Sequence, residues 1–227
     1  MEMRSYGGVR CRVFDDAYEW QKSDREQSDF DRCSVAPHDT AASAMLLDAG
    51  FYFLDRRLSC RISLKRMPEG SSRKRFDTGV LDVSHDDMKQ VFHSAFTSDR
   101  RMQLARCFDD ELSSKVLDGY IYDTADMTLI SCMYKGSPVG CAYLAEEEKS
   151  YFVYLAGVMP KFQGTGAAVE LYRACADFAK EHGKRFLDGQ ISAANTSVMN
   201  IYAGLGADFR NAEDWYVLDR RGVNDDD

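Results

Sequence analysis

The sequence has no long apolar run and no paired cysteine motif. No stretch reaches the roughly 18 consecutive apolar residues of a membrane-spanning helix, and Met1–Tyr6 carries charges instead of beginning an apolar segment. A membrane span and secretion are therefore not expected. The seven cysteines are odd in number and widely spaced, without a C-x-x-C pair, which argues against a zinc site and a disulfide framework. We expect reduced thiols, no bound metal and a cytoplasmic location.

Two widespread phosphate-binding motifs are also missing. A dinucleotide-binding turn follows G-x-G-x-x-G, and Val169 stands where a third glycine would follow Gly164 and Gly166. A Walker loop needs Gly-Lys followed by Ser or Thr, which the chain lacks. The composition is that of a globular protein, with 44% hydrophobic residues and 29 Lys+Arg against 37 Asp+Glu, a formal net charge of −8. This acidic balance disfavours non-specific binding to nucleic acid.

Proline, glycine, serine and basic residues gather between Arg66 and Arg75 and interrupt the apolar pattern. Such a segment predicts an exposed linker. We place the linker at 67–78, between an N-terminal unit, 1–66, and a main domain, 79–227. A chain of 227 residues is long for one small domain and short for two full ones. The N-terminal unit is therefore expected to be a small α/β half-domain.

Capping residues and hydrophobic spacing predict alternating strands and helices. Residues 39–64 are expected to form a helix, a turn and a strand, with Asp39 at the helix start and Gly50 at its end. After the linker, the predicted elements are a strand at 79–83, helices at 84–96 and 110–117, strands at 127–134, 139–145 and 151–158, a helix at 165–182, a strand at 185–191, a helix at 196–205 and a strand at 215–218. Hairpin-length turns join the three middle strands. The sequence thus predicts a mixed α/β fold with a central, mostly antiparallel sheet flanked by helices.

Two capped helix-turn-strand units share one spacing. The matching residues are Asp39, Gly50 and Phe53 in the first unit and Asn195, Gly206 and Phe209 in the second. The differences 195 − 39, 206 − 50 and 209 − 53 all give 156. A duplicated half-domain and chance similarity both explain the match, and both predict that the two units look alike. The first unit carries Leu46 where the second carries Tyr202, so it cannot perform chemistry that needs a phenol.

The densest chemical signal is the segment Val158–Ala168, where a strand leads into a helix through two closely spaced glycines. The first N–H groups of a helix have no backbone partner and the helix dipole adds positive potential, so such a turn suits a phosphate. A side chain at Gly164 or Gly166 would keep a pyrophosphate away from the backbone. The alternative is an ordinary glycine-containing turn between a strand and a helix.

This segment resembles the acyl-CoA-binding motif of GNAT N-acetyltransferases, which follows V-x-P-x-x-x-G-x-G. The order of elements from Gly79 onward is also similar, so the resemblance implies a GNAT fold with acetyl-CoA as co-substrate. It implies that the loop holds the CoA pyrophosphate and that the preceding strand binds the pantetheine through its backbone, where two strands splay apart. The residues given this role are Leu155, Ala156, Val158, Gln163, Gly164, Thr165, Gly166 and Ala167. Lys161 departs from the Gln or Arg that the family usually has at its position.

A second motif lies on the helix expected at 196–205. Asn195 and Tyr202 are seven residues apart (202 − 195), close to two helical turns, so they point to the same side of the helix. The GNAT resemblance implies that Asn195 lies against the CoA arm and that Tyr202 protonates the departing thiolate. A tyrosine packed on an amphipathic helix is the alternative.

The N-terminal unit and the ending Gly206–Leu218 resemble those of bacterial TDP-fucosamine (dTDP-4-amino-4,6-dideoxygalactose) acetyltransferases. This resemblance implies an amino-sugar-nucleotide acceptor and makes Arg100 a candidate contact to the sugar or diphosphate, because a guanidinium binds phosphate in a bidentate way. A solvated basic residue beside Asp99 is the alternative. Two other functions stay open: a GNAT enzyme for a protein N-terminus, a lysine or a small-molecule amine, and a non-catalytic acyl-CoA-binding module.

The implied reaction is direct attack of an acceptor amine on acetyl-CoA. An amine beside electron-withdrawing groups has a lower pKa than lysine, so a fraction is neutral near neutral pH and water can carry its proton away. A backbone N–H of Leu155–Val158 would meet the oxyanion. Glu146, Glu147 and His93 are candidate bases, and the sequence assigns none of them. It leaves the oligomeric state open, a homodimer included, and neither nucleic acid nor a membrane is an expected partner.

Overall fold

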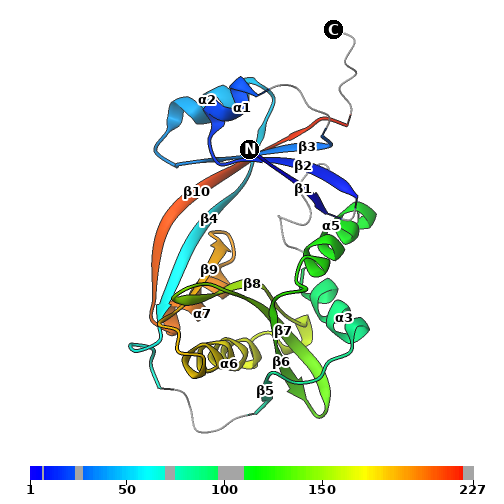
Figure 1. Ribbon diagram of the computed structural model, residues 1–227, viewed down its shortest axis with the longest axis vertical. Coiled ribbons are helices and arrows are strands. Elements are labelled where there is room, and N and C mark those ends of the chain that lie inside the picture. Colours follow the sequence, from blue (N-terminus) through cyan, green and yellow to red (C-terminus); the bar gives the residue numbers. More distant parts are fainter. Residues whose placement is uncertain (7, 24–27, 70–74, 97–109, 222–227) are drawn as a thin grey trace.

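One sheet of ten strands runs through the part of the chain that the computed structural model describes, residues 1–6, 8–23, 28–69, 75–96 and 110–221, and helices lie on both of its faces (Figure 1). In chain order the elements are β1 (Glu2–Tyr6), β2 (Val9–Phe14), α1 (Ala17–Lys22), β3 (Phe30–Val35), α2 (Thr40–Asp48), β4 (Tyr52–Ser63), β5 (Asp77–Gly79), α3 (His85–Ala95), α5 (Asp110–Tyr122), β6 (Thr128–Tyr134), β7 (Ser137–Glu146), β8 (Ser150–Val158), a 3-10 helix (Pro160–Phe162), α6 (Ala167–Glu181), β9 (Phe186–Ser192), α7 (Thr196–Gly204) and β10 (Ala207–Asp219). The strand order is β1-β2-β3-β10-β4-β9-β8-β7-β6-β5. The mixed α/β fold predicted from the sequence is confirmed.

Two long strands differ from the sequence-based expectation. β4 is a single strand of 12 residues, and β10 has 13 residues instead of only 215–218. Both contain charged residues that break the apolar alternation, but these charges pair inside the sheet. Arg56 of β4 binds Asp214 of β10, and Arg61 of β4 binds Asp188 of β9, each at 2.6 Å. Cross-strand ion pairs therefore keep these polar residues within continuous strands.

Smaller differences lie near the linker and at the N-terminus. The strand expected at 79–83 is Asp77–Gly79, because only these residues pair with β6, and the next residue, Val80, is 62% exposed. The sequence pattern does not predict β1, β2 or β3, whose strands have only five or six residues. The division into 1–66, a linker and 79–227 stays a prediction, and both parts contribute strands to the same sheet.

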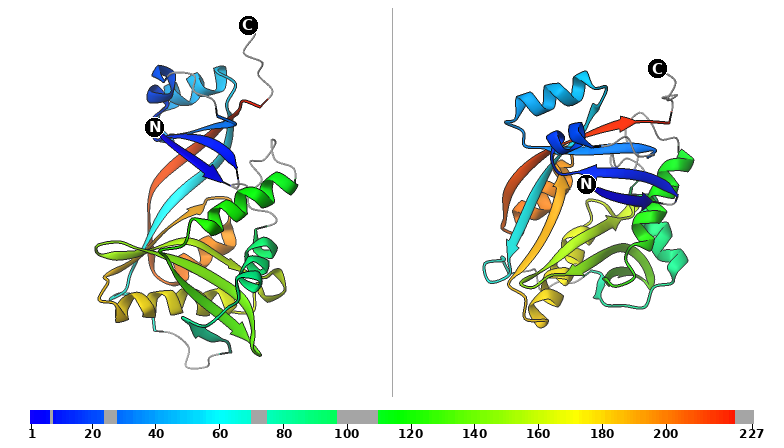
Figure 2. Two further views of the ribbon diagram at one scale, coloured as in Figure 1. Left: turned by 45° about the vertical axis from the view of Figure 1, so that its right-hand side comes forward. Right: turned by 45° about the horizontal axis from the view of Figure 1, so that its top comes forward.

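β4 and β10 are neighbours in the middle of the sheet and join its two ends. β4 lies between β10 and β9, and β10 lies between β3 and β4. Figure 2 shows these strands, cyan and orange to red, running side by side from the upper to the lower part of the molecule. Their pairing is symmetric: Cys60 opposite Gly189 corresponds to Tyr216 opposite Cys33, since 216 − 60 and 189 − 33 both give 156. Each half of the chain therefore supplies a strand to the other half.

The two capped units look alike, as the shared spacing predicts. α2 and α7 have nine residues each and begin 156 residues apart (196 − 40). The side chains of Asp39 and Asn195 accept hydrogen bonds from N–H groups of the first helical turn, at 2.9 and 3.1 Å. Gly50 and Gly206 follow the helices with φ of +91° and +78°, a region that favours glycine.

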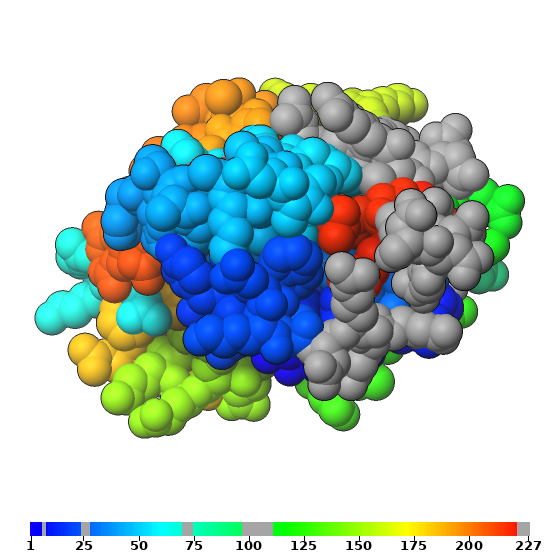
Figure 3. Space-filling model, turned by 90° about the horizontal axis from the view of Figure 1, so that it is seen from above, coloured from blue at the N-terminus to red at the C-terminus, as the bar shows by residue number. Residues whose placement is uncertain are grey.

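Helices on both faces divide the core into three clusters. α6 and α7 cover one face with a cluster that includes Leu171, and α3 and α5 cover the other with a cluster that includes Phe92. α1 and α2 cover the N-terminal end of the sheet around Leu46. Figure 3 shows this end, where blue and cyan residues of the N-terminal half lie beside red residues of β10. α3 and α6 both contact β7 and β8, so these strands lie between the two main clusters.

The sequence predicts no membrane-spanning helix, no metal site and no disulfide, and the structure bears on these only for the residues that it describes. Among them, no helix is long and apolar enough to cross a membrane. No group of three or more His, Cys, Asp or Glu side chains in the same ranges could hold a metal ion. The described cysteines are free thiols and all are buried.

Candidate functional site

β8 separates from β9 partway along its length. The parallel ladder between the two strands ends at Val153 opposite Gly189, while β9 continues beside β4. β7 stays paired with β8 as far as Val158, with a register shift that leaves out Tyr154 where the separation begins. Within the described ranges, the backbone of Leu155–Val158 thus has no strand partner on the β9 side. These are the residues expected to bind a pantetheine arm.

The loop after β8 ends in a helix start with unpartnered N–H groups. Gly164 and Gly166 have φ of +74° and +96°, and Gly166 is the N-cap of α6. The first helical bond runs from the Glu170 N–H to the Gly166 carbonyl at 3.0 Å. The N–H groups of the first three helical residues, 167–169, come before this bond and remain available for an anion, and the dipole of the 15-residue helix adds to their positive potential.

A cavity of about 850 Å³ opens between the free part of β8, this loop, α6 and α7. Six residues expected from the sequence line it: Ala156, Val158, Gln163, Gly164, Gly166 and Asn195. A Cβ built on either loop glycine meets no atom within 4 Å, so the space above the loop backbone is open. The Gln163 amide also donates to the Val158 carbonyl at 3.2 Å, which fixes the loop against the strand. The splayed strand and the anion-binding loop therefore face one cavity.

Three other expected residues lie outside the wall of this cavity. Leu155 is buried in the cluster under α3 and α5, and Ala167 is fully buried under α6. Their expected contacts are made by the backbone, which side-chain burial does not affect. Thr165 donates its hydroxyl to the Phe162 carbonyl at 2.6 Å and lines a different cavity. Lys161 lines that second cavity too.

Tyr202 is buried beside the cavity and does not line it. It is 1% exposed, and its ring packs edge to face against the ring of Tyr172, with centroids 5.0 Å apart and an angle of 66° between the ring planes. Tyr172 itself lines the cavity. Burial raises the pKa of Tyr202 well above its ordinary value, so the phenol stays protonated at neutral pH. The structure therefore places Asn195 in the cavity wall and Tyr202 one side chain behind it.

Gly189 and Cys60 surround the Tyr202 hydroxyl and were not expected from the sequence. A Cβ at Gly189 would lie 2.5 Å from the Tyr202 hydroxyl oxygen and 3.5 Å from the Cys60 sulfur. The Cys60 thiol donates to the Gly189 carbonyl at 3.3 Å. Because Gly189 is the last residue of β9 paired with β8, the hydroxyl lies at the apex of the splay. The N-terminal half thus contributes a residue to the surroundings of the phenol.

Gly157 is another lining residue that sequence reasoning missed. A Cβ at this position would lie 2.8 Å from the Cβ of Ala95, which is closer than such atoms approach. The end of α3 can pack against β8 only because residue 157 has no side chain. Ala95 and Phe96 then close one side of the cavity.

The candidate bases are all engaged elsewhere. His93 Nε2 lies 2.9 Å from the Asp118 carboxylate, and the Glu147 carboxylate accepts from the Ser150 hydroxyl at 2.6 Å. A hydrogen bond from Lys184 lowers the pKa of Glu146. None of the three candidates lines the cavity. Arg100, the candidate acceptor contact, lies outside the described residues.

Residues 86–207 match the family model described as the Acetyltransferase (GNAT) family. The chain belongs to the GNAT acetyltransferase family. Members of this family use acetyl-CoA as acyl donor, which agrees with a splayed strand and an anion-binding loop facing one cavity. Membership supports an acyl-CoA N-acyltransferase activity at the level of the family.

Solved structures similar to this GNAT protein share its fold at low identity. A conserved protein of unknown function from Staphylococcus epidermidis is 16% identical with a TM-score of 0.66, over 93% of this chain and 84% of that one. A GCN5-related N-acetyltransferase from Sphaerobacter thermophilus is 14% identical with a TM-score of 0.61, over 91% and 65%. A tandem GNAT protein from the clavulanic acid biosynthesis pathway is 10% identical with a TM-score of 0.56, over 92% and 68%. No curated protein matches the sequence.

Proposed function

We propose that this protein transfers the acetyl group of acetyl-CoA to a primary amine. The observation that carries the proposal is one cavity of about 850 Å³, which is lined by the part of β8 beyond its pairing with β9, by the glycine loop and by Asn195. A strand edge offers alternating donors and acceptors to an amide-containing arm, and a helix N-terminus attracts a pyrophosphate. The cavity wall therefore offers groups that suit both the amide-containing arm and the pyrophosphate of an acyl-CoA molecule.

In this proposal the chain stabilises both charges that develop during transfer. A backbone N–H of Leu155–Val158 donates to the oxyanion, since the β9 side of this segment has no strand partner within the described ranges. Tyr202 donates its proton to the departing thiolate. Its phenol is protonated at neutral pH, as a proton donor must be, and burial raises its pKa and so makes it a weaker acid than an exposed tyrosine. The acceptor amine loses its proton to water, since no side chain is assigned as base.

The acceptor proposed is an amino-sugar nucleotide of the 4-amino-4,6-dideoxyhexose class. The support is the N-terminal half, residues 1–66, which contacts the wall of the cavity through β4. The Ser192 hydroxyl, in the cavity wall, donates to Asp55 at 2.7 Å, and the Ala193 N–H donates to the Arg56 carbonyl at 2.8 Å. One similar structure is described as a glucosamine N-acetyltransferase region of a fungal multi-domain enzyme, at 12% identity and a TM-score of 0.58 over 86% of this chain and 26% of that one.

A second candidate acceptor is a cationic amine such as a polyamine, a lysine side chain or a protein N-terminus. The formal net charge of −8 favours it, because a negative surface raises the encounter rate with cations. A non-catalytic acyl-CoA-binding role is the third candidate. The presence of Tyr202 at the apex of the splay argues against it.

A panel assay separates these functions. The purified protein is mixed with acetyl-CoA and, in separate reactions, dTDP-4-amino-4,6-dideoxygalactose, spermidine, a lysine peptide and a peptide with a free N-terminus, and thiol release is followed. We expect release with the amino-sugar nucleotide and an acetylated product by mass spectrometry. Thiol release only with a cationic amine would contradict the amino-sugar acceptor and would still support an acetyltransferase activity. If calorimetry shows that CoA binds but none of the amines is acetylated, the result would support the non-catalytic acyl-CoA-binding role.

A further inference from the structure

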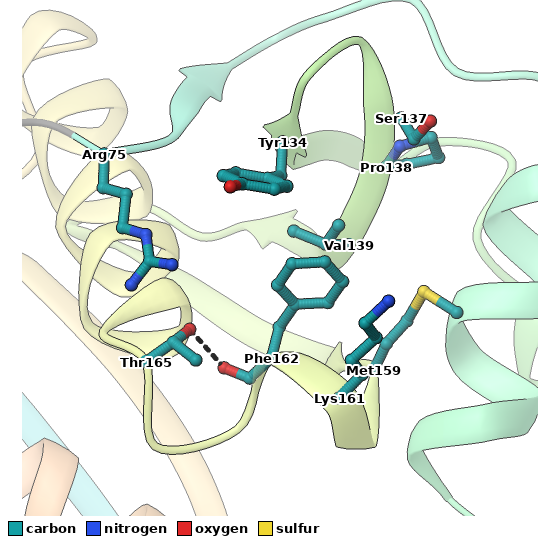
Figure 4. A pocket seen from close by; sticks show the side chains of 9 residues that line it. All are labelled: Arg75, Tyr134, Ser137, Pro138, Val139, Met159, Lys161, Phe162 and Thr165. Atoms are coloured by element: carbon teal, nitrogen blue, oxygen red, sulfur yellow. Dashed lines mark hydrogen bonds between the residues drawn. The ribbon is translucent and has the colours of Figure 1, made fainter.

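A second cavity of about 530 Å³ lies on the other side of the loop that joins β8 to α6 (Figure 4). It shares no lining residue with the larger cavity, because loop residues divide between the two. Gln163, Gly164 and Gly166 face the larger cavity, whereas Lys161, Phe162 and Thr165 line the second. The second cavity is completed by the end of β6, the start of β7, Met159 and Arg75, which lies just before β5.

Two cations line this cavity, and neither has an acidic partner among the described residues. Within the described ranges, Arg75 and Lys161 have no carboxylate within ion-pair distance, and no acidic residue lines the cavity. The nearest acid on α6, Glu170, uses its carboxylate to accept the backbone N–H groups of Arg75 and Phe76, both at 3.2 Å. In a chain of net charge −8, two such cations at one cavity favour an anionic ligand.

Aromatic rings form much of the remaining wall. The rings of Tyr134 and Phe162 have centroids 5.5 Å apart, and Phe76 lies behind them at 5.7 and 6.4 Å. In the view of Figure 4 the Phe162 ring lies between the Arg75 guanidinium and the Lys161 ammonium. A flat ring can pack against Tyr134 or Phe162 while an attached anion reaches one of the cations.

We propose that the second cavity binds a small anion that carries a flat ring, such as a nucleoside monophosphate or an aryl phosphate. Two sources offer this chemistry, a free ligand and the nucleotide end of the acyl donor. The absence of shared lining residues favours a free ligand that binds together with the donor. The site lies directly behind the residues that face the donor, separated from them only by the loop.

Binding of AMP and of phenyl phosphate to protein saturated with CoA tests the proposal by calorimetry. The variants are Arg75→Gln and Lys161→Gln, both at exposed side chains, so the fold is expected to persist. Lys180→Gln, at an exposed lysine in the last turn of α6, is the matched control for loss of one positive charge. We expect at least one probe to bind the CoA complex, each site variant to weaken it about tenfold, and the control to leave it unchanged. Adenosine and inorganic phosphate, each with half of the recognised chemistry, should bind more weakly.

Three results would overturn the proposal. The first is that neither probe binds the CoA complex. The second is binding that the Arg75 and Lys161 variants leave unchanged. The third is displacement of the probes by CoA together with weaker CoA binding in the same variants, which would give the cavity to the nucleotide end of the donor. The affinity for CoA is expected to stay within about twofold in the Arg75 and Lys180 variants, since neither residue faces the larger cavity.

Discussion

Tyr202, which we propose protonates the departing thiolate, is shielded from bulk water. Its burial raises the pKa of the phenol, and its ring is fixed by Tyr172. Tyr202→Phe removes the hydroxyl and preserves this packing. We expect kcat to fall tenfold or more, toward the ~10²–10⁴ range of proton-transfer groups, while calorimetry shows CoA affinity within about twofold of wild type. An unchanged kcat would remove the phenol from the mechanism.

Gly189 provides the space for that hydroxyl. In Gly189→Ala the new Cβ would lie 2.5 Å from the Tyr202 oxygen, so the phenol must move. We expect a loss of kcat similar to that of Tyr202→Phe and a lower melting temperature. Gly204→Ala, on α7 close to Tyr202, is the matched control, because a Cβ there meets no atom within 4 Å.

A double mutant tests whether the two positions act through this one contact. In the Tyr202→Phe background the oxygen is gone, so Gly189→Ala should cost less stability there than in the wild-type protein. Thermal unfolding of the two single mutants and the double mutant gives the comparison. Strictly additive losses would mean that the alanine acts on another neighbour.

The surroundings of Tyr202 show which site residues a sequence can reveal. The glycine loop and the Asn195 cap are local signals, visible within a dozen residues, and the structure places both at one cavity. Cys60 and Gly189 meet across a separation of 129 residues, through the pairing of β4 with β9. No pattern along the chain records such a contact, so strand pairing had to be known first. The role of Tyr202 itself stays a prediction.

Asp31 of β3 joins β2, α1 and the segments before β3 and after β10 in one buried cluster. Its carboxylate, 0% exposed, accepts hydrogen bonds from Arg12 of β2 at 2.6 and 2.7 Å, Trp20 of α1 at 3.0 Å, Ser28 before β3 at 2.9 Å and Arg220 after β10 at 2.7 Å. Burial raises the pKa of Asp31, but these hydrogen bonds outweigh it, and the pKa lies below its ordinary value. The carboxylate form is therefore the one that stabilises the fold.

Asp31→Asn is expected to lower the free energy of unfolding by about 3–5 kcal/mol, because it leaves the buried Arg12 without its counter-charge. Since the folded pKa is below the unfolded one, the contribution of Asp31 is present above about pH 4. It is lost as the pH falls through the lower folded value. Urea unfolding measured near neutral pH and again below about pH 4 should show a smaller acid-induced loss in the variant than in wild type.

A surface ion pair provides the comparison for Asp31. Glu111 and Lys115 pair at 2.7 Å one turn apart on α5, and both side chains are more than half exposed. Glu111→Gln should change the free energy of unfolding by no more than about 0.5 kcal/mol. An equal effect of the two substitutions would contradict the role given to the buried cluster.

At the level of elements, the sequence predicts helices better than the two longest strands. The first residues of α2, α3 and α7 follow from the N-caps Asp39, Ser84 and Asn195, whose side chains accept hydrogen bonds from the first helical turn. β4 and β10 are held together by ion pairs such as Arg56–Asp214, and charged residues in a row do not predict a strand. Partners distant in sequence decide the length of these strands.

At the scale of the whole molecule, the exchanged strands predict that neither half folds alone. Without β4, β9 and β10 lose the strand between them, and without β10, β3 and β4 are no longer joined. We expect fragments 1–69 and 75–227, expressed separately, to show no cooperative thermal transition by circular dichroism. Mixed together, they should regain one. A fragment 75–227 that melts cooperatively and binds CoA would show instead that the main domain is independent.

In the N-terminal half, the positions that correspond to the surroundings of Tyr202 form a packed core. The positions equivalent to Tyr202, Gly189 and Cys60 hold Leu46, Cys33 and Tyr216, which pack together in one cluster (202 − 46, 189 − 33 and 216 − 60 each give 156). β2 ends at Phe14 opposite Cys33, the point at which β8 continues past Gly189. This half therefore supplies a strand and a packed core, and the cavity belongs to the other half.

The exchange of β4 and β10 within one chain also has a consequence for how protein concentration affects stability. Two separate chains that exchanged strands in this way would dissociate on dilution, since their association is bimolecular. Here both strands belong to one polypeptide, so the exchange is intramolecular. The strand exchange by itself therefore adds no dependence of the melting temperature on protein concentration, even though the sheet is built like that of a strand-exchanged pair.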